Sequence, residues 1–231
     1  NRCMGNTNAK KKDSFLKRNY GATTVITSIP ALILDFIFIG FNFFLCFYML
    51  SFWHLTMALY YIMLVVLRIN VFVRSTKALF SKDKEKAYIK LYRSTHRMLL
   101  FLDLMLIIAI FLLLENDVWK SYPRIVINLV AIYTCYKIIA SVVNLFKASS
   151  SKSITATLLR KIGHADALVS VLILISAYIG MSGHTGYYQN LQLAYVSGSI
   201  ACGIIFIIAI TGLLKPKSKI TQVVNIPSQE D

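Results

Sequence analysis

The strongest candidates for a functional site in this sequence are charged residues that interrupt long apolar segments. Asp35, Arg68, Asp103 and Lys137 stand well inside such segments, and Asp166 stands at the start of another. A charge near the centre of a membrane costs about 2.5–3.5 kcal/mol on insertion scales, so it is rarely kept without a partner or a task. The first four comprise two acids and two bases, which favours neutralising pairs between helices. An ion or substrate path and catalysis are the alternatives.

Polar residues accompany these charges at helical spacing. A stripe of this kind faces protein or a water-filled cavity rather than lipid. It therefore indicates either a polar path or a hydrogen-bonded contact between helices, and a chain of this size favours the contact. The stripes are Asp35 with Asn42; His54, Tyr61 and Arg68; Tyr133, Lys137, Ser141 and Asn144; and Asp166 with Ser170.

Catalytic patterns are sparse. Ser182, Gly183 and His184 resemble one piece of the lipid-phosphatase signature, but its other basic and histidine elements are not found in order. No HExxH, GxSxG, Walker or CxxC pattern occurs. His164 and Asp166 are the only candidates for an intramembrane lipid enzyme. We therefore expect no catalytic residue, no cofactor and no metal.

Six apolar segments must position these residues. A transmembrane helix needs about 20 mostly apolar residues, and a lipid-exposed backbone must satisfy its hydrogen bonds within the segment. The third and fifth segments are short, so we expect them to include flanking turns such as 94–97 and 163–166. The sequence predicts an all-α, six-transmembrane-helix bundle within residues 21–214. The predicted spans are 30–50, 55–73, 98–114, 125–146, 167–181 and 191–214.

The composition excludes an ordinary soluble domain, since 57% of the 231 residues are hydrophobic and only 15% are charged. Cytoplasmic loops collect Lys and Arg, so the placement of the +15 net charge gives the orientation. Apart from Arg68, Lys120, Arg124 and Lys137, every Lys and Arg lies on one side of the predicted spans. The chain opens on Asn1 rather than methionine, which we interpret as a trimmed or processed start.

This asymmetry predicts that both ends of the chain lie in the cytoplasm. It assigns a basic tail to 1–20, cytoplasmic loops to 74–97 and 147–166, and a second tail to 215–231. The basic segment at 81–97 has helical spacing, so we expect it to lie on the membrane or to extend the third span. Aromatic anchors are expected at the three outer turns. They are Phe52, Trp53, Trp119, Tyr122, Tyr187 and Tyr188.

In this topology, contact with anionic lipid is enough to explain the positive charge. Anionic lipid at the cytoplasmic face attracts each basic residue by about 1 kcal/mol, so we expect lipid contact and no nucleic-acid partner. The sixth span adds small residues at spacings of four, which let helix backbones approach closely. Internal packing is the favoured reading of this pattern, and a homo-oligomer face is the alternative. The small residues are Ala194, Gly198 and Cys202 on one line and Ser199 and Gly203 on another.

Two stretches carry a resemblance to a known group of proteins. One is the stretch 122–183, which begins YPRIVINLVAIYTCYKIIASVVNLFK and continues through LLRKIGHADALVSVLILISAYIG; the other is LYRSTHRMLLFLDLMLIIAI before it. They look like a group of uncharacterised six-span membrane proteins of Firmicutes. The resemblance implies a bacterial cytoplasmic membrane location and a compact helical fold. It implies no activity and no functional residue.

Three function classes remain open on these observations. We expect a non-enzymatic membrane-complex subunit or scaffold, with a membrane protein partner or a second copy of the chain as the binding partner. The first alternative is a small transporter or channel component that uses the buried charges. The second is an intramembrane lipid-modifying enzyme built on His164 and Asp166.

Overall fold

The computed structural model describes residues 32–48, 50–117, 124–148, 154–182 and 187–215. This part of the chain is all-α and forms six α-helices. A short π-helical segment, η1 (Leu113–Asp117), follows the third of them. The helices are Leu32–Tyr48, α2 (Phe52–Leu79), α3 (Lys84–Leu112), α4 (Arg124–Ala148), α5 (Ile154–Ser182) and α6 (Tyr187–Leu213).

The helix boundaries have local causes. Ser51 caps α2, because its hydroxyl accepts a hydrogen bond from the backbone N–H of His54 at 3.3 Å. The preceding residue, Leu50, has a φ of 48°, in the left-handed region that reverses the chain between two helices. At the other end of α2 only a few residues separate Leu79 from Lys84, so α2 and α3 form a tight antiparallel pair.

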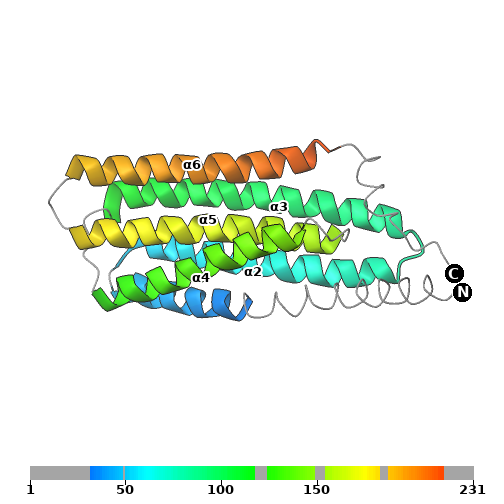
Figure 1. Ribbon diagram of the computed structural model, residues 1–231, viewed down its shortest axis with the longest axis horizontal. Helices are drawn as coiled ribbons and strands as arrows, with labels where there is room; N and C mark the ends of the chain where they lie inside the picture. The colour runs from blue at the N-terminus through cyan, green and yellow to red at the C-terminus, as the bar shows by residue number, and fades with distance from the viewer. Residues whose placement is uncertain (1–31, 49, 118–123, 149–153, 183–186, 216–231) are drawn as a thin grey trace, which may run out of the picture.

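The helices lie side by side along the long axis of the molecule (Figure 1). The most extensive packing joins α4 to α5, α2 to α3 and α3 to α6, and α5 also packs against α6 and α2. The α2–α3 turn, the start of α5 and the end of α6 therefore lie at one end of the bundle. The start of α4 and the start of α6 lie at the opposite end.

Large apolar side chains cover the outside of the bundle as well as its core. Ile132 and Phe47 are 70% and 76% exposed, which a water-facing surface rarely tolerates over a wide area. Four helices are long and apolar enough to cross a membrane, counting only the described residues. These helices fit a membrane protein. The four are Phe52–Ala78, Lys84–Glu115, Ile154–Ile179 and Leu191–Leu213.

The four candidate spans overlap the second, third, fifth and sixth predicted spans. The first predicted span is described only from residue 32, and Leu32–Tyr48 is shorter than the usual spanning length. Residues 140–148 of α4 are among those whose side chains are not described. The six-span topology therefore stays a prediction.

Several helices run further than the apolar segments that predicted them. α2 continues past residue 73, α3 begins at Lys84 rather than near 94, and α5 begins at Ile154 rather than near 163. The basic segment 84–97 is therefore an extension of α3. Among the expected aromatic anchors, Phe52 is exposed, but Trp53 is only 1% exposed and belongs to the core. The remaining anchors lie in residues or side chains outside the described set.

The predicted small-residue lines of α6 have different surroundings. Ala194 and Gly198 are buried and Cys202 is half-buried, and a Cβ placed on Gly198 would lie 3.0 Å from the side chain of Ile110 in α3. Ser199 and Gly203 are exposed, and nothing lies within 4 Å of a Cβ built on Gly203. One line therefore packs inside the bundle, and the other is on its surface.

Candidate functional site

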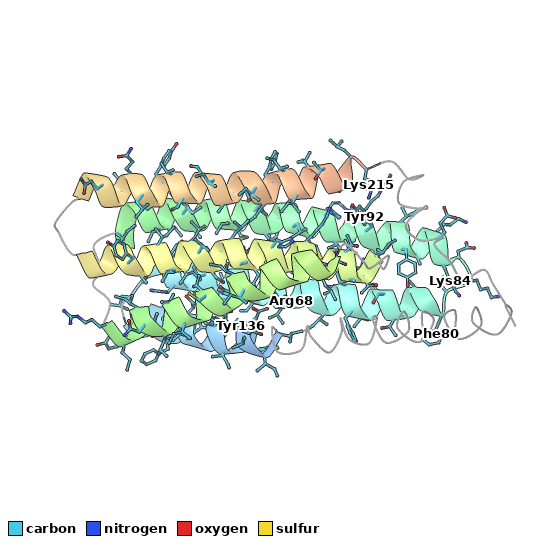
Figure 2. The ribbon with its side chains drawn as sticks, viewed as in Figure 1. Arg68, Phe80, Lys84, Tyr92, Tyr136 and Lys215 are labelled. Carbon is cyan, nitrogen blue, oxygen red and sulfur yellow. The ribbon has the colours of Figure 1, made fainter. Side chains whose placement is uncertain are left out.

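Four of the charged residues singled out from the sequence meet inside the bundle. Asp35 comes from helix Leu32–Tyr48, Arg68 from α2, Lys137 from α4 and Asp166 from α5. All four are at most 6% exposed. Figure 2 labels Arg68 near the middle of the long axis of the bundle. We call these residues the charge cluster.

The charge cluster is a closed ring of alternating charge. Arg68 Nη2 donates a hydrogen bond to Asp166 Oδ2 at 2.6 Å, and Lys137 Nζ donates to Asp35 Oδ1 at 3.2 Å and also to Asp166 Oδ1. Arg68 Nη1 lies 3.1 Å from Asp35 Oδ2. That last ion pair is not aligned as a hydrogen bond, so Asp35 Oδ2 has no hydrogen-bond donor among the described residues. Each acid thus contacts both bases, and the formal charges cancel.

Aromatic rings enclose the Lys137 ammonium group. The Nζ atom lies 4.6 Å from the ring centre of Tyr133, 4.9 Å from that of Tyr61 and 5.9 Å from that of Phe38. Phe38 stacks on Tyr133 with a centroid separation of 3.6 Å. A cation desolvated against ring faces gains about 2 kcal/mol or more, so the rings offset part of the cost of burying Lys137.

A chain of polar contacts leads from the charge cluster along α5 and α4. Ser170 donates to the backbone carbonyl of Asp166 at 2.9 Å. Its single hydroxyl hydrogen is then used, so Tyr61 is the donor in the 3.5 Å contact between the two hydroxyls. Thr134 donates to the Ser170 carbonyl at 3.0 Å and so ties α4 to α5. All of these side chains are buried.

A second polar contact joins the same two helices, between Asn42 of helix Leu32–Tyr48 and His54 of α2. Asn42 Nδ2 donates to the Phe38 carbonyl at 2.9 Å, and its Oδ1 accepts from His54 Nδ1 at 3.1 Å. Both side chains are at most 3% exposed. The seven-residue stripes predicted on the first two helices therefore face each other. Ser141 and Asn144, which completed the stripe on α4, lie outside the side chains that the structure describes.

Two buried tyrosine hydroxyls near the cluster lack a hydrogen-bond partner among the described residues. They belong to Tyr60 and Tyr133, which are 0% and 8% exposed. Buried polar groups are nearly always paired, and an ordered water is the usual partner when protein atoms are absent.

Asp103 is not part of the charge cluster. It is 3% exposed on α3, where its carboxyl group is hydrogen-bonded to the thiol of Cys202 in α6. Its Oδ1 atom has no hydrogen-bond partner within the described structure. Asp166 therefore takes the place in the charge balance that was predicted for Asp103.

A separate, partly buried contact involves a lysine and a glycine that the sequence did not single out. His96 Nδ1 donates to the Tyr92 carbonyl at 2.8 Å, which leaves Nε2 to accept from Lys161 Nζ at 2.9 Å. Lys161 also lies 5.6 Å from the Tyr92 ring centre. Gly212 of α6 packs directly on the His96 ring, since a Cβ there would overlap the ring. Nothing in the spacing of the basic residues of α5 predicted that Lys161 would contact His96.

The two residues considered for lipid chemistry lie in different environments on α5. Asp166 is engaged by Arg68 and Lys137, while His164 is only half-buried. The triplet at 182–184 lies outside the described side chains. Within the described residues, no three His, Cys, Asp or Glu side chains gather in a way that could hold a metal ion.

Comparison with known proteins adds no family to this geometry: no family model, no curated protein and no solved structure matches the chain.

Proposed function

We propose that this chain is a six-span membrane protein of the bacterial cytoplasmic membrane, with both ends in the cytoplasm, and that it acts as a non-enzymatic subunit or scaffold of a membrane complex. The charge cluster is then a joint that fixes four helices in register. In this proposal the exposed helix faces and the basic end of the bundle bind partners.

The closure of the charge cluster is the observation that carries this proposal. Each acid forms an ion pair with both Arg68 and Lys137, and the four side chains are at most 6% exposed. A transported ion or a substrate would have to compete with ion pairs that are already formed and already neutral. A buried polar or charged residue fixes helix register in some coiled coils, and the proposal gives the charge cluster the same role.

The distribution of the described basic side chains supports the proposed orientation. Arg74, Lys77, Lys84, Arg160 and Lys215 all lie at the end of the bundle that holds the α2–α3 turn. At the opposite end, Arg124 is the only basic residue whose side chain is described. A membrane protein keeps Lys and Arg on the cytoplasmic side, so the basic end is assigned to the cytoplasm.

The exposed face of α6 favours the binding of a partner helix. Ser199 and Gly203 are exposed on the same face, and nothing lies within 4 Å of a Cβ built on Gly203. Small residues let another helix approach closely in lipid. A second copy of the chain and a different membrane protein both fit this face. Oxidative cross-linking of Ser199→Cys in membranes distinguishes them by the mass of the product.

A small transporter is the second candidate, and the unpaired buried hydroxyls favour it. Tyr60 and Tyr133 leave polar atoms next to the charge cluster that only water could satisfy in the described structure. Internal waters between acids and tyrosines can pass protons. Proton flux into vesicles that contain the purified chain supports this candidate, provided that Asp35→Asn abolishes the flux.

The scaffold proposal is tested by its partner. The chain is extracted from its source membrane in a mild neutral detergent, and the co-purifying proteins are identified by mass spectrometry. A partner at fixed ratio, with which the purified chain reassembles, supports the proposal. Isolation as a lone particle, together with ion flux in reconstituted vesicles, overturns it in favour of transport.

A further inference from the structure

A groove lined by basic residues runs along the first turns of α3. It has a volume of about 460 Å³ and is lined by Glu85, Lys86, Ile89, Lys90, Arg93 and Arg97. This volume falls within the range of about 300–1,000 Å³ that is usual for small-molecule sites. Glu85 is the single acid in the lining, against four bases, so the groove attracts anions.

The four bases form one line on the helix. Lys86, Lys90, Arg93 and Arg97 follow each other at intervals of four, three and four residues, which places them on one face. Lys86 forms an exposed ion pair with Asp83 at 3.1 Å. Within the described residues no acid is paired with the other three. The Nε–H of Arg93 is buried and has no acceptor there.

The same face changes from basic to apolar immediately after Arg97. Phe101, Leu104 and Ile108 continue the line at intervals of four, three and four residues, and they are 48%, 53% and 45% exposed. The face therefore offers cations and an unsatisfied guanidinium donor at one end and an uncovered apolar strip at the other. Figure 2 labels Lys84 and Tyr92, which bracket the first half of the basic part.

We propose that this face of α3 is a binding site for one anionic phospholipid. The lipid phosphate lies in the basic groove against Arg93 and Arg97, and the acyl chains lie along the apolar strip. Arginine suits this role because its planar fork donates two parallel hydrogen bonds to phosphate oxygens. The inference rests on the membrane location proposed above but not on the scaffold role.

Retention of individual lipids tests the proposal. The full chain is purified in a neutral detergent and titrated with phosphatidylglycerol or phosphatidylcholine of the same acyl length, and bound lipids are counted by native mass spectrometry. One phosphatidylglycerol should be retained, and phosphatidylcholine should not. The exposed double variant Lys90→Gln with Arg97→Gln should weaken this binding about tenfold or more, because charge-assisted hydrogen bonds are the strong ones.

Three further measurements separate the site from general attraction. Lys77→Gln with Lys82→Gln removes the same charge from exposed positions outside the groove, and it should change retention by less than about twofold. Arg93→Lys keeps the charge and should still weaken binding, because the fork is lost. Phe101→Ala with Leu104→Ala should weaken binding through the acyl chains alone.

Two results overturn the proposal. Equal losses in the groove and control double variants show diffuse attraction instead of a site. Displacement of the lipid by inorganic phosphate at comparable concentration, with no effect of the apolar variant, shows a site for free phosphate. Neither result affects the membrane assignment, which fails only if the chain is recovered without detergent extraction.

Discussion

The strongest expectation concerns a pair of substitutions inside the charge cluster. Replacing Lys137 with Met leaves Asp35 and Asp166 facing Arg68 alone, with one uncompensated negative charge in a site at most 6% exposed. Adding Asp35→Asn removes that surplus charge. The remaining Arg68–Asp166 pair keeps its 2.6 Å hydrogen bond and is neutral. The double variant should therefore be more stable than Lys137→Met.

The size of the effect follows from the distances. Unit charges 3.2 Å apart, as in the Lys137–Asp35 pair, attract by about 5 kcal/mol at an effective dielectric constant of about 20. Part of this is offset because Lys137 no longer has to be desolvated. Removing one partner of a buried pair costs about 3–5 kcal/mol in practice. We expect the free energy of unfolding to fall by that amount in Lys137→Met, and about 2–3 kcal/mol to be recovered in the double variant.

Unfolding by dodecyl sulfate in mixed micelles, followed by circular dichroism, measures these differences. Trp53 is 1% exposed and gives a second, fluorescence-based signal. The matched control is Lys137→Met with Asp103→Asn, which neutralises a buried acid that is hydrogen-bonded to Cys202 instead. In this control, the loss of stability should equal the sum of the losses in the two single variants to within about 0.5 kcal/mol. Equal recovery by Asp103→Asn, or no loss of stability in Lys137→Met, would refute the reasoning.

Three smaller changes have expected outcomes of their own. Gly212→Ala should destabilise the protein by about 1–3 kcal/mol, because His96 is held through both ring nitrogens and cannot move aside. Gly203→Ala is the control and should be neutral or stabilising, because its Cβ would meet nothing. The same micelle titration compares the two variants. Tyr60→Phe should leave stability unchanged or higher, because the hydroxyl has no hydrogen-bond partner among the described residues; a loss above about 1 kcal/mol would contradict this. Ser51→Ala should cost about 1 kcal/mol and increase hydrogen exchange in the first turn of α2, and unchanged exchange there would contradict the capping role.

Sequence reasoning found the buried ionisable residues but not their partners. Asp35, Arg68 and Lys137 stood out because an apolar segment rarely carries a charge, and the structure brings them together. Helical periodicity gives the face on which a residue lies, and it carries no information about which helix is packed against that face. Asp103 therefore looked as suitable a partner as Asp166.

Hydropathy also placed Asp166 too close to a helix end. The polar residues before it, among them Arg160, Lys161 and His164, do not interrupt α5, which begins at Ile154. Asp166 is thus about 18 Å from the start of its helix, at a rise of about 1.5 Å per residue. An apolar window marks the part of a helix that can lie in lipid, and the hydrogen-bonded helix can continue beyond it. The same reason explains the early start of α3.

The composition of the charge cluster has a consequence for how the chain is made. Helix Leu32–Tyr48 and α2 contribute one acid and one base, and α4 and α5 contribute another such pair. In the proposed membrane topology, each consecutive hairpin therefore brings one negative and one positive charge to the cluster while the ribosome is still extending the chain. A hairpin can leave the translocon with its own charges matched, and the exchange of partners between the two hairpins can wait until both are in the bilayer. In this order of events no charge of the cluster enters lipid without its counter-charge.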